Sequence, residues 1–341
     1  MKKVVVTGAG GFIGRAFTDY LLDRGHEVFA VTRDPVRLAC ELSAPNLKTI
    51  KADLAAYGHL AEKIPAAETF YHFVWDGVWG KKAGDYEVQL QNIKAACAAL
   101  EQAARMGCKK FVLAGSVSEL EIREHLDRNI CRPRLANIYA AAKLTAEIMC
   151  KTLAVRNQIE ISVGLLANTF GPGDRSRRST NIILGKMLNG EAPALVKGEG
   201  LNDWLYIRDA VRLLEAMGER GKNGKTYYIG HTNLWPLRKT IERARDAVAP
   251  GLKLEFGTVP DEFLTDYSYI STGELYADTG CKAEYDFEQA VRETAVWVRE
   301  IFKCEEKHQK NIQNTEKNME ETGKMRKESK KLGGGVIPPS P

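Results

Sequence analysis

Tyr139 and Lys143 have the types and the spacing that proton transfer requires. Of the twelve tyrosines in the chain, only Tyr139 has a lysine four residues later. The segment between the two is all alanine and is predicted to be helical, which places both side chains on one face, one turn apart. An ammonium beside a phenol favours the phenolate and lowers the tyrosine pKa from about 10 toward neutral pH. The same spacing also fits a helix with a buried tyrosine and a solvent-facing lysine.

A serine near a predicted strand end favours the catalytic interpretation. Ser116 stands just past the predicted strand over residues 111–114, and ligands bind at the carboxyl ends of parallel strands. A hydroxyl there can donate to a carbonyl or alkoxide oxygen. Ser118 is a second candidate for this role, and a simple turn serine beside Gly115 is the alternative without function.

A glycine-rich stretch near the start of the chain predicts a phosphate-binding turn. Thr7 to Gly14 reads Thr-Gly-Ala-Gly-Gly-Phe-Ile-Gly and lies between a β-branched run and a predicted helix over residues 12–22. We expect Gly8 to allow the tight turn, Gly11 to let the backbone approach a phosphate, and Gly14 to let the helix pack closely. The free N–H groups and positive dipole end of that helix would then face a dinucleotide pyrophosphate. An ordinary strand-turn-helix is the alternative.

The elements that position these residues alternate along the chain. Predicted strands cover residues 28–31, 47–50, 69–74, 111–114 and 159–165, and long predicted helices cover 86–106 and 135–155. Such alternation implies right-handed crossovers and a parallel sheet that is covered on both faces. We therefore predict an α/β fold with a doubly wound parallel sheet over residues 1–170, joined by a late strand or helix from the C-terminal half. A smaller substrate-binding lobe is predicted mainly over 171–303.

Composition narrows the class of protein further. The net charge of +5 is modest and does not indicate nucleic acid or an anionic membrane as a partner. Seven cysteines without C-x-x-C spacing and six histidines without ligand spacing predict reduced thiols and no metal site. No apolar run approaches the roughly 18 residues of a membrane span. We expect a cytoplasmic protein with a charged, solvated or disordered tail over residues 304–341.

With these motifs together, the chain resembles the extended short-chain dehydrogenase/reductase family of NAD(P)-dependent nucleotide-sugar epimerases, dehydratases and ketoreductases, over roughly residues 3–302. The resemblance implies a Rossmann domain and catalysis by Ser116, Tyr139 and Lys143. Expected cofactor-binding residues are Thr7, Gly8, Gly10, Gly11, Phe12, Ile13, Gly14, Thr32, Arg33, Asp53, Leu54, Val74, Asn92, Tyr139 and Lys143. Expected substrate-binding residues are Trp75, Ser118, Asn168, Arg177 and Arg178.

Departures from the family pattern shape the predicted chemistry. Asn202 stands where the family's signature carries an arginine, so Arg177 or Arg178 is expected to contact the substrate phosphates instead. Val117 and Ser118 stand where 4,6-dehydratases of the family carry an Asp-Glu pair. Dehydration is therefore set aside.

The residues at the end of the second predicted strand indicate whether the cofactor is NADP or NAD. Thr32 occupies the position at which NAD enzymes of this type place an acidic residue for the ribose 2′-hydroxyl. Thr32 and Arg33 suit a 2′-phosphate, with Arg33 as a charge-assisted donor. NADP is favoured, and Asp34 keeps NAD possible.

The resemblance and the cofactor together predict a reaction. NADPH reduces the ketone of a 4-keto (deoxy)sugar nucleotide, Ser116 binds the carbonyl oxygen, Tyr139 supplies the proton, and Lys143 anchors the nicotinamide ribose. A nucleotide-sugar 4-epimerase with tightly bound NAD is the alternative, and a catalytically silent nucleotide sensor is a third. Family members often pair through two long helices, so we also expect a homodimer through helices 86–106 and 135–155.

Overall fold

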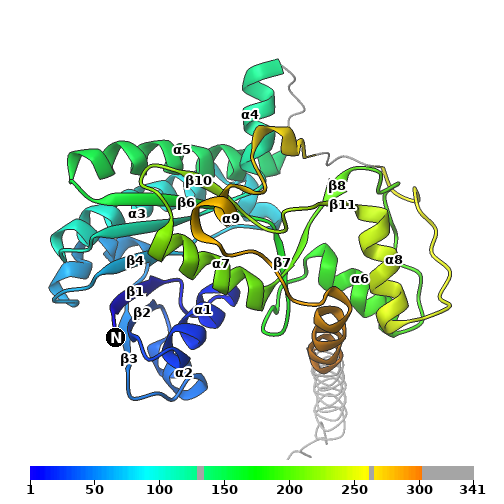
Figure 1. Cartoon of the computed structure of the whole chain (residues 1–341), viewed down its shortest axis with the longest axis horizontal. Coiled ribbons are helices and arrows are strands. Elements are labelled where there is room, and N and C mark those ends of the chain that lie inside the picture. The colour runs from blue at the N-terminus through cyan, green and yellow to red at the C-terminus, as the bar shows by residue number, and fades with distance from the viewer. Residues whose placement is uncertain (129–133, 261–264, 302–341) are drawn as a thin grey trace, which may run out of the picture.

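A seven-stranded parallel sheet forms the centre of the larger half of the protein (Figure 1). The computed structural model describes residues 1–128, 134–260 and 265–301. The strand order is β10-β6-β5-β4-β1-β2-β3, and each neighbouring pair is parallel. The strands are β1 (Lys3–Thr7), β2 (Glu27–Thr32), β3 (Leu47–Lys51), β4 (Thr69–His72), β5 (Lys110–Ser116), β6 (Glu160–Leu166) and β10 (Thr226–Ile229). The chain order reverses between β1 and β4, where such sheets bind ligands at their carboxyl ends.

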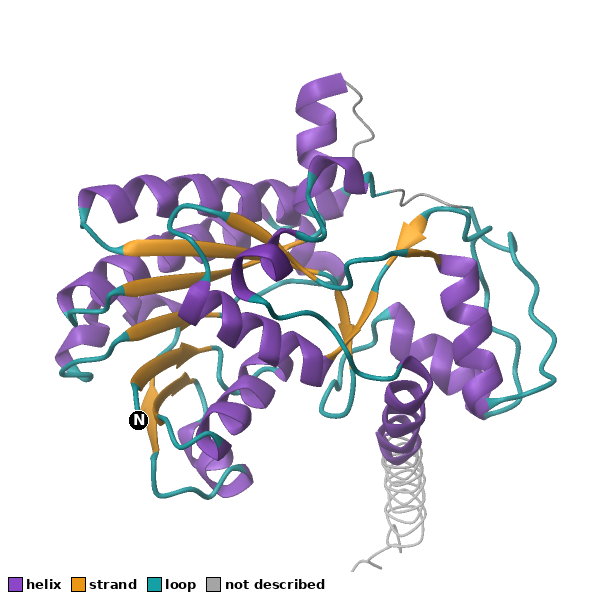
Figure 2. Ribbon diagram, in the orientation of Figure 1, coloured by secondary structure: helices purple, strands orange, loops and turns teal. Residues whose placement is uncertain are grey.

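Helices cover both faces of this sheet (Figure 2). On one side lie α3 (Tyr86–Arg105) and α5 (Leu135–Arg156), and on the other lie α1 (Phe12–Asp23) and α7 (Ile207–Arg220). The remaining helical elements of the larger half are α2 (Pro35–Glu41), α4 (Glu119–Arg128), α9 (Glu274–Thr279) and the 3₁₀ segments η1 (Leu54–Glu62), η2 (Gly80–Gly84) and η3 (Tyr267–Tyr269).

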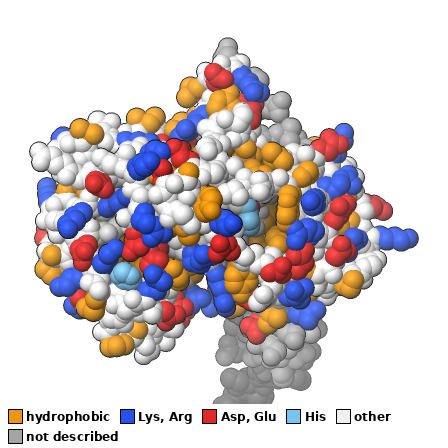
Figure 3. All heavy atoms as spheres, viewed as in Figure 1, with side chains coloured by type: hydrophobic (Ala, Val, Ile, Leu, Met, Phe, Trp, Pro, Cys, Tyr) orange, Lys and Arg blue, Asp and Glu red, His pale blue; other side chains and the backbone are white. Residues whose placement is uncertain are grey.

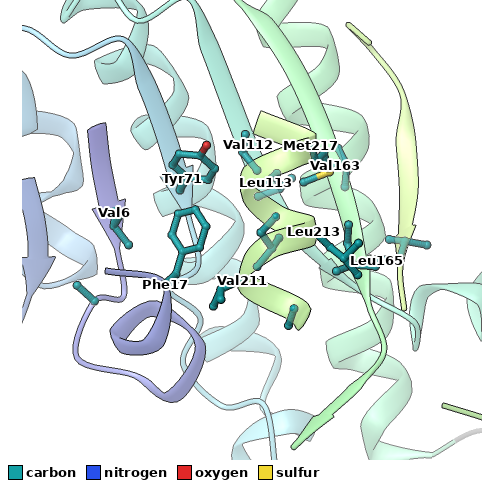
Figure 4. Close-up of a cluster of buried hydrophobic side chains, with 14 of the residues drawn as sticks. Val6, Phe17, Tyr71, Val112, Leu113, Val163, Leu165, Val211, Leu213 and Met217 are labelled. Atoms are coloured by element: carbon teal, nitrogen blue, oxygen red, sulfur yellow. The ribbon is translucent and has the colours of Figure 1, made fainter. Parts of the chain in front are cut away.

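The core lies where α1 and α7 meet the sheet (Figure 4). Phe17 of α1 and Leu213 of α7 are at most 1% exposed, and both pack against the sheet. Gly218 allows α7 to approach the sheet closely, because a Cβ at this position would lie 2.1 Å from the Tyr71 hydroxyl. The inner strands β2, β1, β4, β5 and β6 are almost completely buried, which explains their nearly continuous apolar sequences, whereas the edge strand β3 has no buried residue.

A smaller lobe lies beyond the carboxyl ends of the strands. It contains α6 (Ser179–Leu188), α8 (Leu237–Val248), the strand pair β8 (Leu201–Asn202) and β11 (Trp235–Pro236), and the pair β7 (Asn168–Phe170) and β9 (Trp204–Tyr206). A helix covers residues 287–301 at the end of the described chain. Basic and acidic side chains are interspersed over the face shown in Figure 3. Within the described ranges, no helix combines the length and the apolar character needed to cross a membrane.

The predicted doubly wound parallel fold is confirmed, with two local differences. The strand predicted over 69–74 ends at His72, where the chain leaves the sheet beside the glycine-rich turn. The strand predicted over 111–114 continues to Ser116, because Ser116 pairs with Leu166 on β6. The division of the chain near residue 170 stays a prediction, and the predicted tail over 304–341 lies outside the described residues.

Candidate active site

Ser116, Tyr139 and Lys143 come together at the carboxyl end of β5. Ser116 is the last residue of that strand, and Tyr139 and Lys143 lie one turn apart on α5. The Ser116 hydroxyl lies close enough to the Tyr139 phenol to lower its pKa. The Lys143 ammonium donates to the carbonyl oxygen of Ala114 at 2.8 Å and lies 3.8 Å from the centre of the Trp75 ring. Strand and helix thus hold a hydroxyl, a phenol and an ammonium at one point of the sheet edge.

The electrostatics of the pair differ from the sequence-based expectation of a lowered tyrosine pKa. Burial raises the pKa of Tyr139 to about 12, and the Ser116 hydroxyl only partly opposes it. Burial also lowers the pKa of Lys143 to about 8. Desolvation is the largest cause of both shifts, because both side chains are less than 9% exposed. Tyr139 is therefore a neutral phenol at neutral pH, which is the form that can donate a proton.

A backbone amide holds the Ser116 hydroxyl beside the Tyr139 phenol. The backbone N–H of Ser118 donates to Ser116 Oγ at 3.2 Å, so that oxygen already accepts one bond. The backbone N–H of Ser116 donates to Glu119 Oε1 at 2.7 Å. Ser118 thus supports Ser116 through its amide, and Ser116 is the serine that touches Tyr139.

The glycine-rich turn has the conformation that the motif predicts. Gly8 has a φ of +68°, and a Cβ there would lie 2.7 Å from the backbone nitrogen of Val74. A Cβ at Gly14 would lie 2.2 Å from the carbonyl oxygen of Gly8, so only glycine lets α1 pack onto the turn. Thr7 is fully buried, with its hydroxyl 3.1 Å from His72 Nδ1, and Ile13 is half-buried.

The start of α1 fits the phosphates of a dinucleotide. In the described chain, no side chain caps this helix at Gly11, and its first turn holds no acidic residue. A cavity of about 540 Å³ opens here, and its lining includes Gly10, Gly11, Phe12, three arginines (Arg15, Arg37 and Arg175) and two carboxylates (Glu41 and Asp174). The free amides, the helix dipole and the excess of arginine over carboxylate attract an anion. The residues present therefore fit an NAD(P) cofactor.

Thr32, Arg33 and Asp34 at the end of β2 have different surroundings in the structure. Thr32 is buried against the glycine-rich turn, and its hydroxyl accepts from the N–H of Asp34 at 3.3 Å. The Asp34 carboxylate accepts from the N–H of Arg37 at 3.0 Å and caps α2. Arg33 is exposed and, within the described residues, makes no hydrogen bond or ion pair. Arg33 is thus the side chain at this strand end that can turn to a ligand.

Other predicted cofactor residues lie near the same edge but have partners in the protein. Asp53 is exposed at the end of β3 and caps η1 through the N–H of Ala56 at 3.1 Å, and Leu54 follows it, half-buried. Asn92 uses both ends of its amide on the backbone of Asp76, each bond at 2.8 Å. Asn92 therefore fixes the loop that carries Trp75, a role different from the direct cofactor contact predicted for it.

The predicted substrate residues separate into two groups. Asn168 donates to Asn202 Oδ1 at 3.4 Å, and Trp75 meets the Tyr139 ring edge to face at 6.2 Å. Arg178 is held by Asp174 at 2.9 Å and lies between the rings of Phe12 and Trp79, 5.8 and 5.4 Å from their centres. Its positive charge also acts on Tyr139.

Arg177 lies elsewhere. It is exposed and lines a separate cavity of about 320 Å³ between α6 and the helix over 287–301. Among the described residues lining that cavity are neither Ser116 nor Tyr139. The geometry thus brings Arg178, and not Arg177, toward the phenol.

Glu119, Arg15, Arg37 and Arg175 belong to this site but were not predicted from the sequence. Glu119 could have been found from the spacing Ser116-Val-Ser-Glu119, which is the capping-box pattern that returns a glutamate to the N–H three residues earlier. Arg15 directly follows Gly14, and Arg37 lies four residues after Arg33, so both basic side chains belong to segments already singled out.

Comparison with known proteins gives a consistent result. Agl12, a low-salt glycan biosynthesis protein of Haloferax volcanii, is 23% identical over 301 residues, which cover 84% of this chain and 96% of that protein. A double mutant of DesIV, a dTDP-glucose 4,6-dehydratase of Streptomyces venezuelae with NAD bound, has a TM-score of 0.71 at 20% identity, covering 88% of this chain and 97% of that one. UDP-N-acetylglucosamine 4-epimerase of Methanobrevibacter ruminantium M1 has a TM-score of 0.71 at 22% identity, covering 87% and 97%.

These structural neighbours share the fold of this chain. The model of the NAD dependent epimerase/dehydratase family matches residues 4–230. This match spans the glycine-rich turn, the catalytic candidates and well over half of the sequence, and the chain therefore belongs to the NAD-dependent epimerase/dehydratase family.

Proposed function

We propose that the protein is an NADPH-dependent reductase of a 4-keto (deoxy)sugar nucleotide, with Tyr139 as proton donor. One observation carries the proposal. Tyr139 is a buried, neutral phenol that interacts with Ser116 and lies one helical turn from Lys143, at the carboxyl end of a parallel sheet. A ketone that accepts hydride at this edge needs a donor of this kind to protonate the oxygen.

The roles of the three residues follow from their geometry. The nicotinamide of the bound cofactor supplies the hydride. Ser116 donates a hydrogen bond to the carbonyl oxygen, keeps its proton, and stabilises the charge that develops there. Tyr139 then transfers its phenolic proton to the same oxygen. The positive charge of Lys143, one turn away, stabilises the phenolate that remains, and its ammonium holds the nicotinamide ribose.

The neighbours of Ser116 argue against dehydration. Removal of water from a sugar needs an acid and a base on the substrate side, and Val117 and Ser118 carry no carboxylate. Glu119 is the first carboxylate after Ser116, but it is fully buried and its Oε1 binds the Ser116 amide. This burial keeps Glu119 from the substrate and leaves hydride transfer with proton transfer as the chemistry.

The basic side chains near the glycine-rich turn support NADP. Arg33 is free to reach the ribose, and Arg15 and Arg37 line the cavity beside it. The Arg37 guanidinium is 2.9 Å from Glu41, a contact that a 2′-phosphate could replace with its own charge. A reductase needs such an exchangeable cofactor, because each turnover consumes one NADPH.

A 4-epimerase with tightly bound NAD is the second candidate. The similarity to a UDP-N-acetylglucosamine 4-epimerase and to a dehydratase with NAD bound supports it. An epimerase would use Ser116, Tyr139 and Lys143 in the same roles but would return its hydride to the substrate. In either case we propose a nucleotide-sugar substrate held by Trp75, Asn168 and Arg178.

Apolar side chains on two packed helices support a homodimer. Leu90 on α3 and Ile148, Met149 and Val155 on α5 are 45–82% exposed, although α3 and α5 pack against each other. A second copy applied to this face would bury them. Light scattering should give twice the chain mass, and Ile148→Lys should give the monomer mass; a monomeric wild-type protein would contradict the dimer.

The reductase is tested by its stoichiometry. Offered 4-keto-6-deoxy sugar nucleotides, the protein should oxidise one NADPH for each ketone reduced, followed by absorbance and product chromatography. Interconversion of two sugar nucleotides without loss of NADPH absorbance would favour the epimerase. Binding of a cofactor without turnover of any substrate would favour a sensor.

A further inference from the structure

Two buried carboxyl groups lie directly behind the candidate active site. Glu119 at the start of α4 is 0% exposed, and Glu147 on α5 is 4% exposed. Tyr139, Lys143 and Glu147 follow one another at intervals of four residues, so they share one face of α5. The two carboxyl groups lie close enough to interact, and the charge of Glu147 raises the pKa of Glu119. Two buried carboxylates in contact repel each other, so the pair needs a proton.

The partners of the two groups show which one holds that proton. Glu147 accepts from Thr226 at 2.6 Å, from Lys151 at 2.9 Å and from Arg123 at 3.2 Å. Burial opposes ionisation of Glu147, but these donors lower its pKa below the usual value. Glu119 has only the Ser116 amide, on Oε1, and in the described chain its buried Oε2 lacks a donor. An Oε2 that carries the proton and donates to Glu147 explains this.

We propose that Glu119 is a positioning residue. It is a neutral acid bonded to Glu147, and it fixes the Ser116 amide. This contact aims the Ser116 hydroxyl at the substrate carbonyl. The inference rests on the role proposed above for Ser116. A glutamate that merely capped a helix would be an exposed carboxylate. Here Gly115 lets the carboxyl group press against the strand end, since a Cβ there would lie 2.7 Å from Glu119 Oε1.

The charges around Glu119 determine the pH above which it no longer holds the Ser116 amide in place. Tyr139, Lys143 and Lys151 face the pair from α5, and Arg123 faces it from α4. Burial, and then the Glu147 carboxylate, raise the pKa of Glu119 to about 8. Above that pH, Glu119 would become a second buried anion against Glu147. The repulsion would displace the turn that holds Ser116.

Infrared spectroscopy tests the proton without any substrate. The wild-type protein with bound cofactor, labelled with ¹³C-glutamate, should show at about pH 6 the carbonyl band of a protonated carboxyl, and lose it near pH 10. Glu119→Gln should lack this band at both pH values. Glu121→Gln is the matched control, since Glu121 lies on the same turn of α4 and pairs with Arg134, and it should keep the band. A wild-type spectrum without the band overturns the proposal, whatever reaction the enzyme catalyses.

Kinetics test the positioning. Glu119→Ala should lower kcat about 10- to 100-fold with little change in KM, because a misplacement of about 1 Å costs up to about 10²-fold. Glu119→Gln keeps a neutral acceptor for the Ser116 amide and a donor for Glu147, so it should restore kcat to within about threefold.

The pH profile separates positioning from simple support of the fold. Lys143 also titrates near pH 8 and remains in both variants, so a loss of rate at alkaline pH that disappears in Glu119→Gln belongs to Glu119. Unchanged kcat in Glu119→Ala overturns the proposal. So does a Glu119→Gln enzyme that folds, judged by its melting temperature, but is as slow as the alanine variant.

Discussion

Replacement of Arg33 by alanine should weaken the binding of NADPH but not that of NADH. Arg33 follows the last residue of β2, is exposed, and has no hydrogen-bond or ion-pair partner in the described chain. Its removal therefore leaves the packing and the hydrogen bonds of the protein in place. We expect the melting temperature of Arg33→Ala to match that of the wild type.

The magnitude follows from the loss of one charge-assisted contact. A hydrogen bond to a charged group contributes about 1.5–3 kcal/mol. At about 1.4 kcal/mol per factor of ten, Arg33→Ala should weaken NADPH binding roughly 12- to 140-fold. NADH lacks the 2′-phosphate, so its dissociation constant should change by less than about twofold.

Fluorescence titration of both cofactors against both proteins measures this directly. Arg37→Ala is the matched control. Arg37 is one turn away and is already paired with Glu41 at 2.9 Å, so its loss should weaken NADPH binding less than that of Arg33. A wild-type preference for NADH, or an equal loss of both cofactors in Arg33→Ala, would refute the assignment of the 2′-phosphate to Arg33.

Two further changes test the catalytic residues and the core behind them. Tyr139→Phe removes one hydroxyl, so cofactor binding should persist while turnover falls by about 10²–10⁴, as for lost acid-base catalysis; a near-normal rate would refute its role. Burial lowers the pKa of His72 to about 3, whereas the unfolded chain titrates near 6.5, so stability is present above about pH 6.5 and is lost as the pH falls. Between about pH 6.5 and 4.5 the wild type should lose about 2.5 kcal/mol in urea unfolding that His72→Asn retains; equal losses would contradict a neutral buried His72.

Local sequence was enough to predict the helices and strands and the conformation of the glycine-rich turn. Gly14 meets the backbone of Gly8, and Gly8 takes a positive φ within the same turn, so both requirements are local. The strand-helix alternation specifies a parallel sheet with few alternatives. The pairing of Tyr139 with Lys143 on one helix face was likewise a local property, and both residues lie where α5 meets the end of β5.

Properties that depend on burial were not accessible from spacing. The Tyr139–Lys143 spacing predicts a lowered tyrosine pKa, whereas the surrounding core raises it to about 12. Asn92 has the expected position, but both ends of its side-chain amide hydrogen-bond the backbone of Asp76. The contact between Glu119 and Glu147 joins residues 28 positions apart and depends on how α4 packs against α5.

Transfer of labelled hydride tests the reductase most directly. The protein is incubated with NADPH that carries deuterium at the transferred position of the nicotinamide and with 4-keto-6-deoxy sugar nucleotides, and the product is analysed by mass spectrometry. The account predicts one deuterium on the former carbonyl carbon for each NADPH oxidised, and almost no incorporation with Tyr139→Phe. A product that forms without deuterium while NADPH stays reduced would contradict it, because the hydride would then come from a cofactor that never leaves the protein.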